Sequence, residues 1–101
     1  MTEYNKLVRD KVVERIEKKG EPCEWHYCPP EQHLERLLQK LVEEAVELQK
    51  SKSLDEFADV MEVLDAIRKE MSWNNRIIQP IRNKKMRSHG GFSKMIILER
   101  S

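Results

Sequence analysis

Five acidic residues in the middle of the 101-residue chain have the types and spacing of a metal site. Glu43, Glu44 and Glu47 form one group, and Glu56 and Asp59 form a second. Residues three apart lie about 60° apart around a helix, so Glu44 and Glu47 share one helix edge. Glu56 and Asp59 share an edge in the same way. Carboxylates that converge repel one another, so either their pKa values rise or a cation joins them, and oxygen ligands in this number suit Mg²⁺ or Mn²⁺.

Two simpler interpretations of these carboxylates remain open. Glutamates on the flank of a helix are usually solvated and bind nothing. Glu56 also follows Ser53 by three residues, which is the spacing of a capping box. A Glu56 side chain used as a cap would be a poorer metal ligand, so these two roles compete.

Two helices must position the acidic groups, and the recurrence of apolar residues predicts both, over 30–50 and 54–71. The break at 51–53 is so short that the helices must form an antiparallel hairpin, which brings the two acidic pairs to one level. The expected apolar stripe of the first helix consists of Leu34, Leu37, Leu38, Leu41, Ala45 and Leu48. The expected stripe of the second consists of Leu54, Phe57, Ala58, Met61, Leu64 and Ile67.

The flanking segments carry weaker patterns. A first helix is expected over 8–19, and the alternation over 24–28 predicts a short strand. A basic helix is expected over about 77–88, with Pro80 near its start or kinking it. The β-prone segment 94–99 could pair with the strand around Trp25. The expected fold is therefore mainly α, a helical-hairpin bundle in a single domain over 1–101, with at most a small two-stranded β element.

Composition excludes several classes of protein. Hydrophobic residues make up 39% of the chain and fall in periodic runs, which argues against disorder although 37% of residues are charged. No apolar stretch is long enough to cross a membrane, and the N-terminus lacks the apolar core of a signal peptide, so we expect a cytoplasmic protein without a membrane partner. The net charge of +1 conceals a split, because residues 29–71 carry an excess of acid and residues 72–101 an excess of base.

Cysteine and histidine content gives little support for zinc. Cys23, His26 and Cys28 resemble a fragment of a zinc site, but a structural site normally needs four ligands, and the other histidines are His33 and His89. Buried, unreactive thiols are the favoured interpretation.

The acidic motif resembles the signature of the all-α nucleoside triphosphate pyrophosphohydrolases. This group comprises the MazG-type proteins, the dimeric dUTPases and the phosphoribosyl-ATP pyrophosphohydrolases. Residues 4–11 (YNKLVRDK) and 90–99 (GGFSKMIILE) resemble the opening and the ending of a branch of small proteins similar to the phosphoribosyl-ATP enzymes. The resemblance covers nearly the whole chain, and the three segments in order are more specific than the acidic motif alone.

The resemblance implies a Mg²⁺-dependent pyrophosphohydrolase that cleaves a nucleotide between the α- and β-phosphates, giving a nucleoside monophosphate and pyrophosphate. Glu43 and Glu47 are its candidate catalytic residues: Glu43 would help to position the attacking water, and a carboxylate not fully used by metal would accept its proton. The ligands that the resemblance implies for Mg²⁺, or Mn²⁺ in its place, are Glu44, Glu47, Glu56 and Asp59.

Basic residues would hold the remaining phosphates. Lys84, Lys85 and Arg87 are the candidates in the basic segment, and Lys40, one turn before Glu44, is another; a solvated basic face is the alternative for the first three. Residues 9–11 either face the nucleotide or form an ion-paired helix start. The chain departs from the family pattern in its short 48–55 spacing and in His89, where we expect arginine.

Partners follow from the same features. A hairpin with short flanks cannot cover both sides of its helices, so we expect a homodimer or homotetramer, as in the family. The substrate would be a nucleoside triphosphate or related nucleotide. The alternative function is a non-catalytic helical module that binds nucleic acid or a protein through its basic C-terminal segment, although nucleic acid is not the expected partner.

Overall fold

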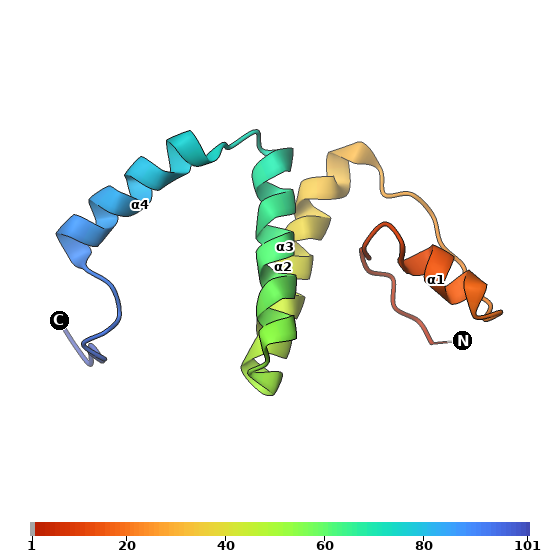
Figure 1. Ribbon diagram of the computed structural model, residues 1–101, viewed down its shortest axis with the longest axis horizontal. Helices are drawn as coiled ribbons and strands as arrows, with labels where there is room; N and C mark the ends of the chain where they lie inside the picture. Colours follow the sequence, from red (N-terminus) through yellow and green to blue (C-terminus); the bar gives the residue numbers. More distant parts are fainter. Residues whose placement is uncertain (1) are drawn as a thin grey trace.

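The computed structural model describes residues 2–101, and this part of the chain is mainly helical without any β-strand. Figure 1 shows two long helices side by side as an antiparallel hairpin, with the N-terminal part on one side and a separate helix extending away on the other. The mainly α fold predicted from the sequence is confirmed. The elements in chain order are α1 (Val12–Lys18), the 3-10 turn η1 (Pro30–Gln32), α2 (His33–Ser51), α3 (Leu54–Glu70) and α4 (Asn75–His89).

The hairpin of α2 and α3 is closed by two residues with definite roles. Lys52 ends α2 in the left-handed conformation, with φ of 51°, and its N–H donates to the Leu48 carbonyl. Ser53 begins α3 as its N-cap, because the Ser53 Oγ accepts a hydrogen bond from the Glu56 N–H at 3.2 Å. The chain therefore reverses immediately, and the end of α2 lies level with the start of α3.

The core between α2 and α3 is small. Leu37, Val63 and Ile67 are buried, and they are the centre of the packing. The partly buried residues packed against them are Leu7, Leu34, Leu41 and Ala66. Leu7 belongs to the N-terminal segment, which is thereby attached to the hairpin.

The stripe predicted for α3 is wrong in part. Phe57 and Met61 are 52% and 57% exposed, and Leu54 and Leu64 are also exposed. The physical reason is that α3 carries two apolar lines, and only the line that includes Val63 can face α2. On α2, Val42 and Val46 are likewise exposed. The hairpin thus keeps a second apolar surface outside its own core.

The segments around α1 differ from expectation. The first helix is shorter than predicted, because residues 4–11 run along the hairpin and make ion pairs with it. The strands predicted over 24–28 and 94–99 do not form, and Figure 1 shows why they cannot pair: the C-terminal segment lies beyond α4, across the hairpin from residues 24–28. Trp25 and Tyr27 nevertheless share a side, where their rings meet edge to face at 5.1 Å.

Helix α4 stands apart from the other helices of residues 2–101. The Asn74 side chain caps its start by accepting a hydrogen bond from the Ile77 N–H at 3.2 Å, and Gly90, with φ of 80°, ends it. Pro80 lies in the second turn, and the helix continues through it. The apolar residues Ile77, Ile81 and Met86 of α4 are exposed. No helix of the described residues is long and apolar enough to span a bilayer.

Candidate metal centre

Three carboxylates converge at the closed end of the hairpin. Glu44 comes from α2, and Glu56 and Asp59 come from the first turns of α3. One oxygen from each lies within 4.8 Å of the others, and each side chain is half-buried. The three side chains converge because the short connection at Lys52 and Ser53 brings the acidic residues of α2 level with those of α3.

The acidic surroundings of Glu56 call for either a proton or a cation. The pKa of Glu56 is raised, first because a protonated Glu56 can hydrogen-bond to Glu44, then by burial and by the charges of Glu44, Asp59 and Glu47. One oxygen of Glu56, Oε2, is buried and has no hydrogen-bond partner among residues 2–101. A buried acceptor facing other carboxylates is stabilised either by a proton or by a metal ion. The donor set, all carboxylate oxygen, fits Mg²⁺ or Mn²⁺.

The competition between capping and metal binding at Glu56 is resolved by the geometry of Ser53. Ser53 Oγ accepts from the Glu56 backbone, whereas the Ser53 N–H donates to Ser51 Oγ at 3.4 Å and not to the Glu56 carboxylate. The capping box is therefore half formed. The Glu56 side chain is left to face the carboxylate cluster.

Glu47 lies at the rim of the cluster. Its side chain is exposed, and it is not among the three residues whose oxygens lie within 4.8 Å. It is still close enough for its charge to raise the pKa of Glu56. Of the four predicted ligands, the structure thus groups three tightly and leaves Glu47 beside them.

Glu43 and Lys40 form a charged group next to the cluster. The Lys40 Nζ lies 3.3 Å from Oε1 of Glu43 and 3.3 Å from Oε1 of Glu44, and its side chain is only 16% exposed. The Lys6 Nζ lies 2.8 Å from the same Glu43 oxygen. The hydrogen bond from Lys6 lowers the pKa of Glu43, and in return Glu43 raises the pKa of Lys6. Lys40 therefore lies next to the carboxylate cluster.

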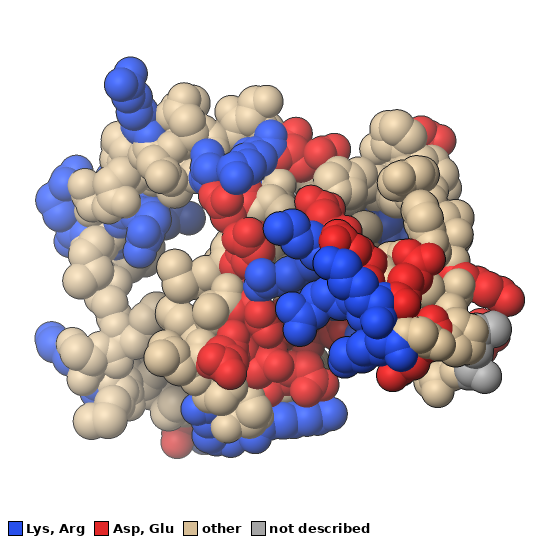
Figure 2. Space-filling model, turned by 45° about the vertical axis from the view of Figure 1, so that its right-hand side comes forward, with Lys and Arg blue, Asp and Glu red and all other residues tan. Residues whose placement is uncertain are grey.

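The structure places two cations on the carboxylates, of which sequence reasoning missed Lys6 and left the role of Arg9 open. Besides Lys6 on Glu43, a guanidinium nitrogen of Arg9 lies 2.8 Å from Oδ1 of Asp59. Figure 2 shows Lys and Arg side chains lying across a band of Asp and Glu side chains at the centre of this face. For residues 9–11 the sequence left two alternatives open, contact with the nucleotide or an ion-paired helix start. No pattern in the sequence indicated a role for Lys6.

The basic residues predicted for phosphate binding on α4 are not brought to the cluster within one chain. Lys84, Lys85 and Arg87 are exposed on a helix that contacts no other helix in residues 2–101. Figure 1 shows α4 leaving the hairpin at the end opposite to the connection between α2 and α3.

Within residues 2–101, Cys23 and Cys28 are not part of any group of three or more metal-binding side chains. Cys23 and Cys28 are free and half-buried. Within residues 2–101 the carboxylate cluster is the only place where three or more metal-binding side chains meet.

Comparison with known proteins does not assign the chain to a family: no protein-family model matches it, and neither a curated protein nor a solved structure shows significant similarity. The chemistry of the site therefore has to be inferred from its geometry and from the motifs in the sequence.

Proposed function

We propose that the protein is a Mg²⁺-dependent nucleoside triphosphate pyrophosphohydrolase, which cleaves a nucleoside triphosphate or related nucleotide between the α- and β-phosphates. The observation that carries the proposal is the convergence of Glu44, Glu56 and Asp59 from two helices to within 4.8 Å. The resemblance of the acidic motif and of the two terminal segments to the all-α pyrophosphohydrolases supplies the reaction. The products would be a nucleoside monophosphate and pyrophosphate.

Each carboxylate has a part in the proposed reaction. Glu44, Glu56 and Asp59 would hold Mg²⁺, or Mn²⁺, with Glu47 completing the set from the rim. A divalent ion there would neutralise phosphate oxygens and lower the pKa of a bound water. Glu43 is a weak base, because Lys6 lowers its pKa, so its part is to orient the attacking water by a hydrogen bond. Glu47, exposed and next to the cluster, is the better acceptor for the proton of that water.

We also propose that the protein works as a homodimer or homotetramer. The radius of gyration of 17.8 Å exceeds the value of about 13 Å typical of a compact domain of this length. The exposed line of α3 with Phe57 and Met61, and the apolar side of α4, are surfaces that a second copy would cover. In such an assembly Lys84, Lys85 and Arg87 of one copy would reach the carboxylates of another.

A second candidate function rests on α4 alone. This helix carries Arg76, Arg82, Lys84, Lys85 and Arg87 without any acidic residue, and it stands free of the other helices of residues 2–101. A non-catalytic module that binds nucleic acid or an acidic protein through α4 would lose affinity steeply with salt and would not require a divalent ion.

The test is pyrophosphate release from a panel of ribo- and deoxynucleoside triphosphates and phosphoribosyl-ATP, with Mg²⁺, with Mn²⁺ and with a chelator. We expect release from at least one nucleotide only when a divalent ion is present. Asp59→Ala and Glu47→Ala should abolish release while circular dichroism shows an intact helical fold. Glu35→Gln is the matched control, because it removes an exposed carboxylate from the first turn of α2. Absence of release across the whole panel would refute the enzymatic function.

A further inference from the structure

The N-terminal segment, residues 4–11, lies across both helices of the hairpin and places one cation against each of them. Lys6 contacts Glu43 of α2 and Arg9 contacts Asp59 of α3, both at 2.8 Å. These contacts join residues 37 and 50 positions apart in the chain, so they depend on the way the segment is folded over the hairpin. The two cations therefore flank the carboxylate cluster on both sides.

The segment is anchored by contacts that do not involve its charges. Leu7, between the two cations, packs against the buried core. The carbonyl of Asn5 accepts a hydrogen bond from Arg36 of α2 at 3.2 Å. Lys6 and Arg9 would thus stay above the site even if their ion pairs were broken.

The two ion pairs are weak enough to exchange. The side chains of Arg9 and Asp59 are 57% and 39% exposed, and those of Lys6 and Glu43 are similarly open to water. Ion pairs in such positions contribute little to stability, because water and salt screen them. Arg9 would therefore leave Oδ1 of Asp59 at small cost if a divalent ion took up that oxygen, and its planar guanidinium fork would then match a phosphate group.

We propose that Lys6 and Arg9 bind phosphate at this site: they are held on Glu43 and Asp59 in the resting protein and move to the substrate's phosphates when metal and nucleotide bind. This inference rests on the proposed function. Lys40 differs from them, because it is nearly buried on α2 between Glu43 and Glu44 and so serves to hold these carboxylates.

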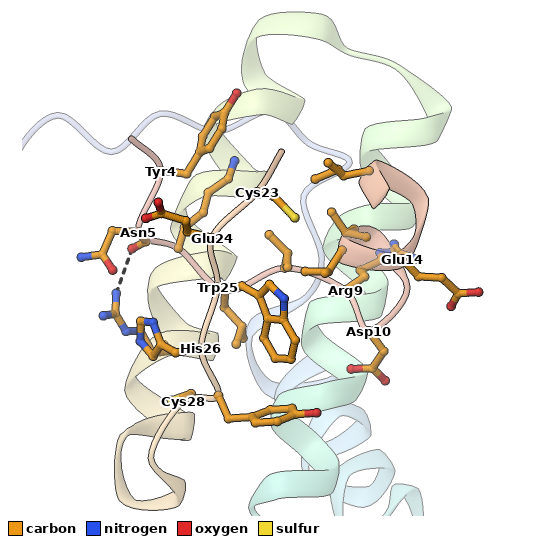
Figure 3. Close-up of a pocket in the computed structure, with 18 of the residues that line it drawn as sticks. Tyr4, Asn5, Arg9, Asp10, Glu14, Cys23, Glu24, Trp25, His26 and Cys28 are labelled. Carbon is orange, nitrogen blue, oxygen red and sulfur yellow. Dashed lines mark hydrogen bonds between the residues drawn. The ribbon is translucent and has the colours of Figure 1, made fainter. Parts of the chain in front are cut away.

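The space next to these cations can accept the rest of a nucleotide. A groove of about 1410 Å³ is lined by the N-terminal segment, α1 and residues 21–29, and both Lys6 and Arg9 are among its walls. Figure 3 shows Trp25 in the middle of this groove, with Arg9 and Asp10 to one side and Asn5 and His26 to the other. The Trp25 side chain is half exposed and offers a flat aromatic surface to a base. A nucleotide bound this way would have its phosphates at Lys6 and Arg9 and its base in the groove.

The test separates metal binding from phosphate binding in the full-length chain. Lys6→Met and Arg9→Met remove each charge while keeping an unbranched side chain. Binding of Mn²⁺ alone is measured by electron paramagnetic resonance, and binding of α,β-methylene ATP in the presence of Mn²⁺ is measured by calorimetry. Lys11→Met is the matched control, because Lys11 is an exposed cation of the same segment that pairs with neither Glu43 nor Asp59 in the described chain.

We expect the two variants to bind Mn²⁺ as tightly as the wild type or up to about fivefold more tightly, since they remove a competing cation. The same variants should bind the nucleotide analogue roughly tenfold or more weakly, which is the effect of losing a charge-assisted hydrogen bond. The Lys11→Met control should match the wild type in both assays.

Three outcomes would overturn the inference in different ways. Unchanged binding of the analogue by both variants refutes it while the proposed function stands. Equal weakening of Mn²⁺ and analogue binding shows that the cations only hold the carboxylates in place. Failure of the wild type to bind Mn²⁺ refutes the metal site itself, and with it both proposals.

Discussion

Divalent metal should raise the thermal stability of the protein, and Glu56→Gln should remove most of that gain while leaving the fold intact. Glu56 is the test residue because it is drawn into a cluster of like charges, with its Oε2 buried and unpaired among residues 2–101. Glutamine keeps the shape of the side chain and can still hydrogen-bond to Glu44. It removes the charge that a metal ion would use.

The size of the metal effect follows from linkage. At a metal concentration a hundred times its dissociation constant, binding to the folded state alone adds about 2.7 kcal/mol. In a domain of about 100 residues each kcal/mol raises Tm by about 4–8 °C, so the wild type should gain roughly 10–20 °C. Glu56→Gln should gain only a small part of this, because one of three converging ligands has lost its charge.

The pH dependence of the stability gives a second test of the charge on Glu56. The pKa of Glu56 lies above its ordinary value of 4.5 in the folded protein, so the folded state holds the proton more tightly than the unfolded state. The stability that this contributes is present below pH 4.5 and is lost as the pH rises through the folded pKa. With a chelator present, Glu56→Gln should therefore match the wild type in acid and become the more stable of the two as the pH rises.

The assay is differential scanning fluorimetry at fixed protein concentration, from about pH 4 to pH 8, with chelator or with Mn²⁺. Glu35→Gln serves again as the control, and it should follow the wild type throughout. A wild type that gains nothing from Mn²⁺ would refute the metal site. A Glu56→Gln variant that is less stable than the wild type at high pH without metal would refute the repulsion argument.

Three further outcomes are expected. Leu37→Ala should lower the free energy of unfolding by about 2–5 kcal/mol in urea titrations, because Leu37 is 4% exposed at the centre of the core; a loss below about 1 kcal/mol would show that the hairpin packs differently. A double-mutant cycle on Arg9 and Asp59 without metal should give a coupling of about 0.2–1 kcal/mol that shrinks at high salt, and a coupling that salt leaves unchanged would contradict the exposed pair. Phe57→Glu with Met61→Lys should convert the assembly to monomers in sedimentation at micromolar concentration, whereas an unchanged species would place the interface elsewhere.

The hairpin and its acidic cluster were predictable because both follow from local rules. The apolar spacing determines the helices, and a connection of two residues leaves the chain no choice but to reverse. Once the helices are antiparallel, the positions of Glu44 and Asp59 relative to the turn decide that they meet. No contact between distant segments is needed for this prediction.

The buried face of α3 was not predictable from its own pattern. The helix has one apolar line through Phe57 and Met61, which is exposed, and another through Val63 and Ile67, which is buried. Periodicity detects an apolar line but does not say what covers it. Within the described chain only α2 packs against α3, and it covers one of the two lines.

The position of residues 4–11 was hidden for a different reason. The segment has no regular structure that would fix the direction of its side chains, and its contacts reach across 37 and 50 residues. The alternation over 24–28 failed in the same way, since a strand needs a neighbour and the C-terminal segment lies on the other side of the hairpin. Local pattern predicts what a segment can form, while the partner decides whether it does.

The distribution of charge along the sequence also did not reveal which cations reach the carboxylates. By sequence, the acidic middle of the chain is balanced by the basic C-terminal segment, and this suggested that the C-terminal cations meet the carboxylates. In the folded chain the cations that reach the carboxylates from outside the hairpin are Lys6 and Arg9, and they come from an N-terminal region with no net charge. The charges of that region cancel in total but are separated in space. Its two cations contact the hairpin, whereas Asp10 and Glu14 line the groove beside it. The basic residues of α4 therefore have no acidic partner on another helix within the described chain. Because α4 is both basic and apolar, it is suited to bind the acidic, apolar flank of a second hairpin.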